Sequence, residues 1–147
     1  MKLHPHGVRE IWTEGRILFS RNAGPFNLEH LQDATEESRE ERKRLTRTGP
    51  WGTVVIMSDS VMFTPEALDM IRDNMADSER NGELVAAAFV VPPGTEGRWI
   101  CESLFAPIYG IAGAKFRLFE ILPPASDWVL KVIDDARKAR SSDQAEH

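Results

Sequence analysis

Three polar residues, Ser58, Asp59 and Ser60, directly follow the apolar run Thr53–Met57. Such a run is typical of a strand buried on both faces of a parallel sheet, and ligands of open α/β sheets bind beyond the carboxyl ends of the strands. An aspartate in that place has the chemistry of a phospho-acceptor, as in receiver domains, which also need an acidic pair after the first parallel strand. Here that strand ends in Ser20-Arg-Asn22. We therefore interpret Ser58 to Ser60 as a polar loop whose side chains satisfy its own backbone.

The single cysteine, Cys101, lies among apolar and aromatic residues, without a histidine nearby in the sequence. A catalytic thiol needs a base or a positive environment, so we expect a buried structural residue. His4 and His6 form a His-x-His pair, but two ligands on a chain terminus make a weak metal site, and His30 is expected to face solvent. Gly-x-Ser-x-Gly, Gly-x-Gly-x-x-Gly and Walker patterns do not occur in the sequence. We expect no catalytic site, no cofactor and no metal.

Thr64-Pro65-Glu66 marks the start of a helix. Threonine is a good N-cap, proline suits the first helical position, and glutamate interacts favourably with the positive end of the helix dipole. We expect this helix to bury a stripe of apolar residues and to end at Asn81-Gly82.

The sequence predicts a helix at Arg98–Ala112 that is apolar on more than one face. Its large apolar residues are Trp99, Ile100, Leu104, Phe105, Ile108 and Tyr109. Such a helix is either buried, here under the closing helix, or offers a hydrophobic groove or dimer face. Membrane-surface helices carry lysine and arginine on their polar face, whereas only Arg98 and Lys115 flank this one. We expect weak or no membrane binding.

Strand-like and helix-like runs alternate along the rest of the chain. The expected elements are a hairpin of Val8–Trp12 and Arg16–Ser20, a helix from the N-cap Asn27 to about Arg47, strands at Leu84–Val91 and Lys115–Ile121, and a last helix opened by Pro123 and Pro124. The order ββαβαβαβα predicts a mixed, largely parallel α/β sheet with crossover helices and an antiparallel first strand. The charged stretch Glu36–Arg44 has mixed signs and is interpreted as a solvated helix face.

A chain of 147 residues suits one domain, expected at residues 1–140 and followed by a polar, disordered tail at 141–147. The net charge of −5 argues against nucleic acid or an anionic membrane as the main partner, because both bind basic faces. One cysteine excludes an intramolecular disulfide, and no run approaches the roughly 20 apolar residues of a spanning helix. We therefore expect a cytoplasmic protein.

Three pieces of the sequence carry a family resemblance. They are Glu14-Gly-Arg-Ile-Leu-Phe-Ser20 with Gly24-Pro-Phe-Asn27, then Val54-Val-Ile-Met57 with Met62-Phe-Thr-Pro-Glu-Ala-Leu68, and Phe119 with Ala125-Ser-Asp-Trp-Val-Leu130. With the element order, they resemble the SpoIIAA-like family of the STAS superfamily of anti-sigma-factor antagonists, which is related in fold to CRAL-TRIO lipid-binding domains. The resemblance covers nearly the whole chain and implies a non-enzymatic regulatory or binding module.

One position departs from that family's pattern. Its antagonists carry a phosphorylatable serine at the head of the second helix. Here Thr64 stands about where the preceding aspartate would be, and Pro65 and Glu66 occupy the serine positions. We expect Thr64 to be a helix cap and the phosphorylation switch to be missing.

Two binding modes follow, and the sequence leaves both open. A module for a protein partner would use the loop and helix start at Ser58, Asp59, Ser60 and Thr64. A carrier of a small hydrophobic ligand, as in the CRAL-TRIO relatives, would use a pocket between the second and third helices and the sheet. The expected lining of that pocket is Met62, Phe63, Met75, Leu104, Phe105 and Ile108. A homodimer is a further possibility for the apolar third helix.

Overall fold

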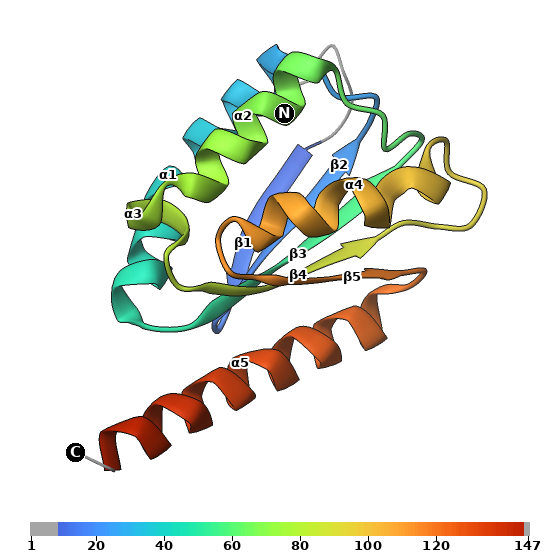
Figure 1. The fold of residues 1–147 in the computed structure, drawn as a ribbon. Helices are drawn as coiled ribbons and strands as arrows, with labels where there is room; N and C mark the ends of the chain where they lie inside the picture. The colour runs from blue at the N-terminus through green and yellow to red at the C-terminus, as the bar shows by residue number, and fades with distance from the viewer. Residues whose placement is uncertain (1–8, 146–147) are drawn as a thin grey trace.

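The computed structural model describes residues 9–145 and shows a mixed α/β fold with a five-stranded sheet (Figure 1). One extra helical turn, α3, is the only addition to the ββαβαβαβα order that the sequence predicts. The bounds are β1 Arg9–Glu14, β2 Ile17–Ala23, α1 Leu28–Thr48, β3 Trp51–Ser58, α2 Pro65–Ala76, α3 Ser78–Asn81, β4 Leu84–Val90, α4 Arg98–Gly110, β5 Lys115–Phe119 and α5 Leu122–Ala145.

The strands lie in the sheet in their sequence order, β1-β2-β3-β4-β5. β1 pairs antiparallel with β2 as a hairpin, and β2 to β5 are parallel. Because the successive crossovers run in the same direction, their helices α1, α2 and α4 cover one face of the sheet, and α5 covers the other (Figure 1). The prediction of a largely parallel sheet with an antiparallel first strand is confirmed.

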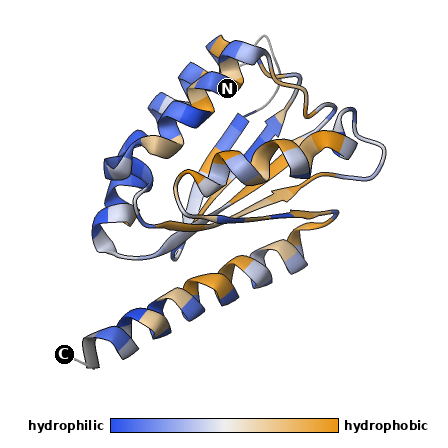
Figure 2. Ribbon diagram, in the orientation of Figure 1, coloured by the Kyte–Doolittle hydropathy of each residue, from blue (hydrophilic) through white to orange (hydrophobic). Residues whose placement is uncertain are grey.

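Side-chain alternation along the strands divides the core into two layers. On β4, Ala86, Ala88 and Val90 belong to the layer that contains α5, whereas Ala87 and Phe89 belong to the layer beneath α1, α2 and α4. Both faces of the central strands are therefore buried, as their near-continuous apolar sequences predict. Figure 2 shows hydrophobic residues on α4 and along the middle of α5, whereas α1 is mostly hydrophilic.

Small residues allow α5 to lie close to the sheet. A Cβ atom built on Gly52 of β3 would lie 2.4 Å from the Val129 Cγ1 atom and 3.2 Å from the Ala86 carbonyl oxygen. Ala86 and Ala88 are themselves completely buried. Their size sets the distance between α5 and the two central strands.

Helix α1 is held at both ends. Its predicted N-cap, Asn27, accepts the backbone N–H of His30 at 2.9 Å. At the other end, the Arg16 guanidinium donates to the carbonyl oxygens of Leu45 at 2.7 Å and Gly49 at 2.6 Å. A helix end leaves such carbonyls without intrahelical partners. The turn before β2 therefore anchors the end of α1.

The second helix ends earlier than the sequence predicts. Asp77 adopts an extended conformation that stops α2 at Ala76, and its side chain accepts the Glu79 backbone N–H at 3.1 Å to cap α3. The expected single helix to Asn81 is therefore two helices. An aspartate competes with the helical backbone in this way because its short side chain bonds to nearby N–H groups.

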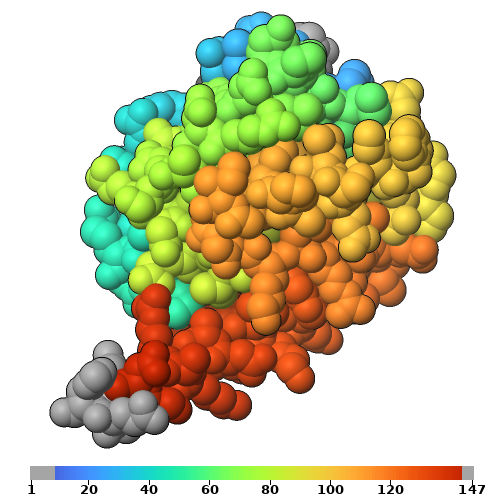
Figure 3. All heavy atoms as spheres, in the orientation of Figure 1, coloured from blue at the N-terminus to red at the C-terminus, as the bar shows by residue number. Residues whose placement is uncertain are grey.

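Two expectations about the C-terminal half also need correction. Helix α4 does not lie under the closing helix: it packs beside α2 on the opposite face of the sheet (Figures 1 and 3). Helix α5 continues to Ala145, past Ser141 where a tail was expected, because no glycine or proline follows Pro124 within it. In Figure 3 its last turns project beyond the rest of the molecule, and Arg140 forms an ion pair with Glu83.

The contact at Gly52 can be tested by substitution. Gly52→Ala places a methyl group against Val129, and overpacking of this kind costs about 1–3 kcal/mol of unfolding free energy. Gly110→Ala, whose Cβ meets nothing within 4 Å, is the matched control and should be neutral or slightly stabilising. Urea denaturation measures both. Equal stability of the two variants would show that α5 does not need this close approach.

Candidate functional site

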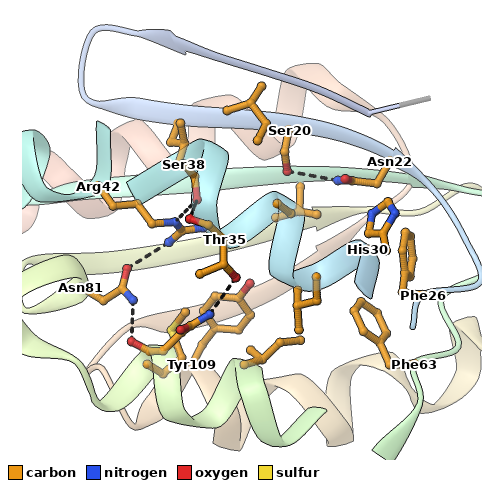
Figure 4. Close-up of a pocket in the computed structure, with 18 of the residues that line it drawn as sticks. Ser20, Asn22, Phe26, His30, Thr35, Ser38, Arg42, Phe63, Asn81 and Tyr109 are labelled. Atoms are coloured by element: carbon orange, nitrogen blue, oxygen red, sulfur yellow. Dashed lines mark hydrogen bonds between the residues drawn. The ribbon is translucent and has the colours of Figure 1, made fainter. Parts of the chain in front are cut away.

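A cavity of about 110 Å³ lies between α1, α2 and the sheet, on the face opposite α5 (Figure 4). Its lining comes from β1, β2, β3, β4 and from all four helices on that face. The lining residues are Ile11, Leu18, Ser20, Asn22, Phe26, His30, Leu31, Ala34, Thr35, Ser38, Arg42, Val55, Met57, Phe63, Ile71, Asn74, Met75, Arg80, Asn81, Phe89 and Tyr109.

The cavity exists because helix α2 lies away from the sheet. Its main contacts are with α1, α3 and α4 rather than with any strand. Polar residues also face inward here: Ser20 and Asn22 alternate with Leu18 on β2, and Ser38 and Arg42 lie one turn apart on α1. These side chains bond to one another or to neighbouring groups across the space under α2, and they leave part of that space open.

Arg42 is the charged group at one end of the cavity. Its Nε donates to the Ser38 hydroxyl at 3.1 Å, its Nη1 donates to the Asn81 side-chain oxygen at 2.9 Å, and its guanidinium carbon lies 5.6 Å from the centre of the Trp51 ring. All three partners are neutral. Burial lowers the pKa of Arg42, and the nearby charge of Arg80 adds to that effect. A guanidinium remains protonated under these conditions.

A chain of hydrogen bonds continues from Arg42 across the helices (Figure 4). The Asn81 amide donates to the Asn74 carbonyl oxygen at 2.7 Å, and the Asn74 amide donates to the Thr35 hydroxyl at 3.0 Å. These bonds connect α1, α2 and α3 at one end of the cavity. Because each amide is held by its neighbour, the polar wall has a fixed arrangement.

Tyr109 reaches the same cavity from α4. The residue is 6% exposed, and its hydroxyl forms no hydrogen bond among the described residues. Burial raises the pKa of Tyr109 to about 12, although the charge of Arg42 acts in the opposite direction. The hydroxyl therefore stays protonated at neutral pH and is a hydrogen-bond donor.

The other end of the cavity is aromatic. Phe26 lies 4.7 Å from Phe63 and 5.0 Å from His30 between ring centres. Two backbone bonds join the loops that carry the phenylalanines: the Phe26 N–H donates to the Met62 carbonyl at 2.9 Å, and the Thr64 N–H donates to the Phe26 carbonyl at 3.0 Å. The wall is thus built from the β2–α1 and β3–α2 loops together.

The predicted loop site lies outside the cavity, at the carboxyl end of β3. Ser58 and Asp59 are exposed, whereas Ser60 is buried and donates to the Glu96 carboxylate at 2.9 Å. The Ser60 N–H donates to the Ser58 carbonyl at 2.8 Å, and Asp59 has a φ of 69°. These features define a γ-turn with positive φ, which is a strained conformation. Thr64 caps α2 by accepting the Ala67 N–H at 3.2 Å.

The six predicted pocket residues separate into four groups. Phe63 and Met75 line the cavity, and Phe105 is completely buried in the core beside it. Leu104 and Ile108 border a shallow surface hollow between α2 and α4. Met62 is 45% exposed, with its sulfur against Gly97. The structure therefore places the cavity between the first and second helices, rather than between the second and third.

The candidate nucleophile and metal ligands have different surroundings. Cys101 is buried and does not line the cavity; burial raises the pKa of its thiol to about 11. His4 and His6 lie outside the described residues. Among residues 9–145, no three His, Cys, Asp or Glu side chains are grouped so that they could hold a metal ion.

Sequence analysis did not identify most of the cavity wall. His30 was expected to face solvent, but it is 8% exposed and packs on Phe26. Arg42 was assigned to the solvated charge run, although it follows the buried Ser38 at a spacing of four residues, which places both on one helix face. On β2, a spacing of two places Ser20 and Asn22 on the inner face with Leu18, which is a signal for an interior polar site.

No protein-family model matches the chain, and no curated protein or solved structure shows significant similarity to it. Within the part of the chain that the structure describes, no helix is long and apolar enough to cross a membrane. The function of the cavity is therefore inferred from its residues alone.

Removal of the cap at Thr64 should affect stability alone. Thr64→Ala leaves the Ala67 N–H without its side-chain acceptor and should lower the unfolding free energy by about 1 kcal/mol, whereas Thr64→Ser retains the cap. Affinity for a ligand or partner should be nearly unchanged in both. Phosphate on Thr64 in protein from its native cells, together with altered binding in Thr64→Glu, would instead support a phosphorylation switch.

Alkaline unfolding tests the burial of Cys101 and Tyr109. In the unfolded chain these groups have lower pKa values and lose their protons first, so stability is complete below about pH 9 and falls as the pH rises towards the folded values of about 11 and 12. We expect Tyr109→Phe and Cys101→Ala each to reduce this fall between pH 9 and 11, measured by urea denaturation. An identical pH dependence in wild type and Tyr109→Phe would contradict the burial of the hydroxyl.

Proposed function

We propose that this chain is a non-enzymatic binding module whose cavity between α1, α2 and the sheet holds a small amphipathic molecule. The observation that carries the proposal is the division of the lining: hydrogen-bonding side chains around Arg42 form one end, and aromatic side chains around Phe26 and Phe63 form the other. Pockets for small molecules combine mostly apolar walls with a few fixed polar groups in this way.

Binding rather than catalysis is supported by the chemistry of Arg42, Tyr109 and Cys101. Arg42 and Tyr109 keep their protons at neutral pH, so they can orient a bound group but do not exchange protons with it readily. Cys101 is a neutral thiol outside the cavity lining. A carrier or a ligand-dependent regulatory module needs these groups only to orient a bound molecule, which they can do in their protonated forms.

The resemblance to SpoIIAA-like proteins and to CRAL-TRIO domains is compatible with this proposal. That resemblance implies a regulatory or binding module, and the CRAL-TRIO relatives bind lipid-type ligands. The cavity found here is small and is divided into polar and aromatic ends, so we favour a compact ligand over a long acyl chain.

A protein partner at the β3–α2 loop is the second candidate function. The supporting observation is the strained turn at Asp59, since such conformations are concentrated at functional sites. Two large apolar side chains are exposed on the same side of the sheet: Met62 in this loop and Trp99 at the start of α4, 45% and 87% exposed. Proteins use exposed apolar side chains of this kind as contact sites.

Native mass spectrometry of protein purified from its own cells tests the two candidates. We expect a bound small molecule in wild type. Ala34→Leu adds volume to the cavity lining and should reduce its occupancy about tenfold or more, because overpacking costs ~1–3 kcal/mol. Ala76→Leu, on an exposed position of α2, is the matched control and should retain the ligand. An empty wild-type protein that retains one defined polypeptide would support the second candidate instead.

A further inference from the structure

We propose that the cavity selects a small monocarboxylate, with its two oxygens bound by Arg42 and Tyr109 and its apolar body against Phe26 and Phe63. This inference rests on the proposed function and adds the class of ligand to it. Two unused donors, one uncompensated positive charge and the cavity volume support it.

Two hydrogen-bond donors at the polar end have no acceptor. The Arg42 guanidinium has five N–H groups, of which Nε and one on Nη1 are engaged; Nη2 donates to no atom among the described residues. The Tyr109 hydroxyl is the second free donor, on a side chain that is 6% exposed. Arg42 and Tyr109 lie near enough for the charge of one to act on the other. Neither atom is among the fully buried side-chain nitrogens and oxygens without a partner, so a ligand that supplies acceptors can reach both donors.

The charge count favours a single negative charge. Among the described residues no carboxylate lies within ion-pair distance of Arg42, whereas Arg80, the other arginine of the lining, has Asp77 at 3.4 Å. Of the two arginines in the lining, Arg42 is therefore the one without a counter-ion among the described residues. A partly buried charge is stabilised most by one opposite charge that also accepts hydrogen bonds. A carboxylate meets this requirement, whereas a phosphate dianion brings a second charge with nothing to balance it.

The Arg42 guanidinium is already held in position. The Ser38 hydroxyl and the Asn81 amide bind it at its edge, and the Trp51 ring lies against it. A ligand that binds Nη2 does not need to order a flexible side chain, so less of the binding energy is lost to entropy. The neutral partners fix the orientation of the guanidinium and leave its charge for the ligand.

The volume limits the apolar part of the ligand. A cavity of roughly 150 Å³ lined by apolar side chains accepts benzene. The cavity here is smaller, about 110 Å³, and must also hold the carboxylate, so a short branched chain fits this space better than an aromatic ring or a long acyl chain. The aromatic rings of Phe26 and Phe63 offer edge and face contacts to such a body.

Three probes with the same branched apolar body test the inference by isothermal titration calorimetry. They are isobutyrate, its neutral isostere isobutyramide, and isopropyl phosphate as a dianion. Wild-type protein should bind isobutyrate about tenfold or more tightly than isobutyramide, because a hydrogen bond to a charged group is worth ~1.5–3 kcal/mol. Isopropyl phosphate should bind more weakly than isobutyrate.

Two substitutions test whether Arg42 and Tyr109 cause the selectivity. Arg42→Gln should reduce isobutyrate affinity about tenfold or more and leave isobutyramide affinity nearly unchanged. Arg44→Gln, on the exposed side of the same helix, is the matched control and should have no effect. Tyr109→Phe, which keeps the ring and removes only the hydroxyl, should also weaken isobutyrate binding, and it tests the inference if Arg42→Gln does not fold.

The outcomes separate the inference from the proposed function. If isobutyramide binds as tightly as isobutyrate, and Ala34→Leu weakens both, the cavity is a ligand site but the carboxylate selectivity is wrong. If isopropyl phosphate binds tightest, the ligand class is a phosphate and the charge argument fails. If wild type binds none of the three probes, and carries no small molecule from its cells, both the inference and the proposed function are overturned.

Discussion

The sequential order of the strands is the constraint from which the rest of the structure follows. Because β2 to β5 are parallel neighbours, every crossover helix falls on one face of the sheet, and only α5 covers the other. Three helices must then share one face. Helix α4 packs on β5 at one edge of the sheet, and α1 contacts β1 at the other edge. Helix α2 packs between these helices more than on any strand, and the cavity lies under it.

Local signals in the sequence were sufficient to predict the fold. Caps such as Asn27 and Thr64 lie where predicted, because their preference depends only on a few neighbouring atoms. The apolar runs of β3 and β4 and their alternation with helices predicted the parallel sheet. The side on which α5 packs was not predicted. That choice depends on Gly52 and on the alanines of β4, whose small size is informative only when the strands are already adjacent.

The cavity could not be predicted in the same way, because its polar side chains come from four helices and a strand that are distant in sequence. Arg42 and Asn81 are 39 positions apart, and neither suggests a site alone. Because Glu36–Arg44 was interpreted as one solvated charge run, Arg42 was not predicted to face the cavity. The predicted pocket between the second and third helices contains real members of the wall, Phe63 and Met75, because both helices border the core. Which pair of helices encloses the cavity depends on how the helices pack in the folded chain, so local sequence patterns do not predict it.

The polar wall has opposite effects on stability and on specificity. Replacing Ser38, Arg42 and Asn81 by apolar residues would allow α1, α2 and α3 to pack on the sheet without a gap, and buried charged networks are often less stable than such packing. The network instead holds the helices at a fixed distance and keeps one charge available. If the proposed ligand supplies the missing acceptors only in the folded state, it stabilises that state, and the stabilisation increases with the logarithm of its concentration. On this proposal, occupancy of the cavity and stability of the fold are coupled through the same side chains.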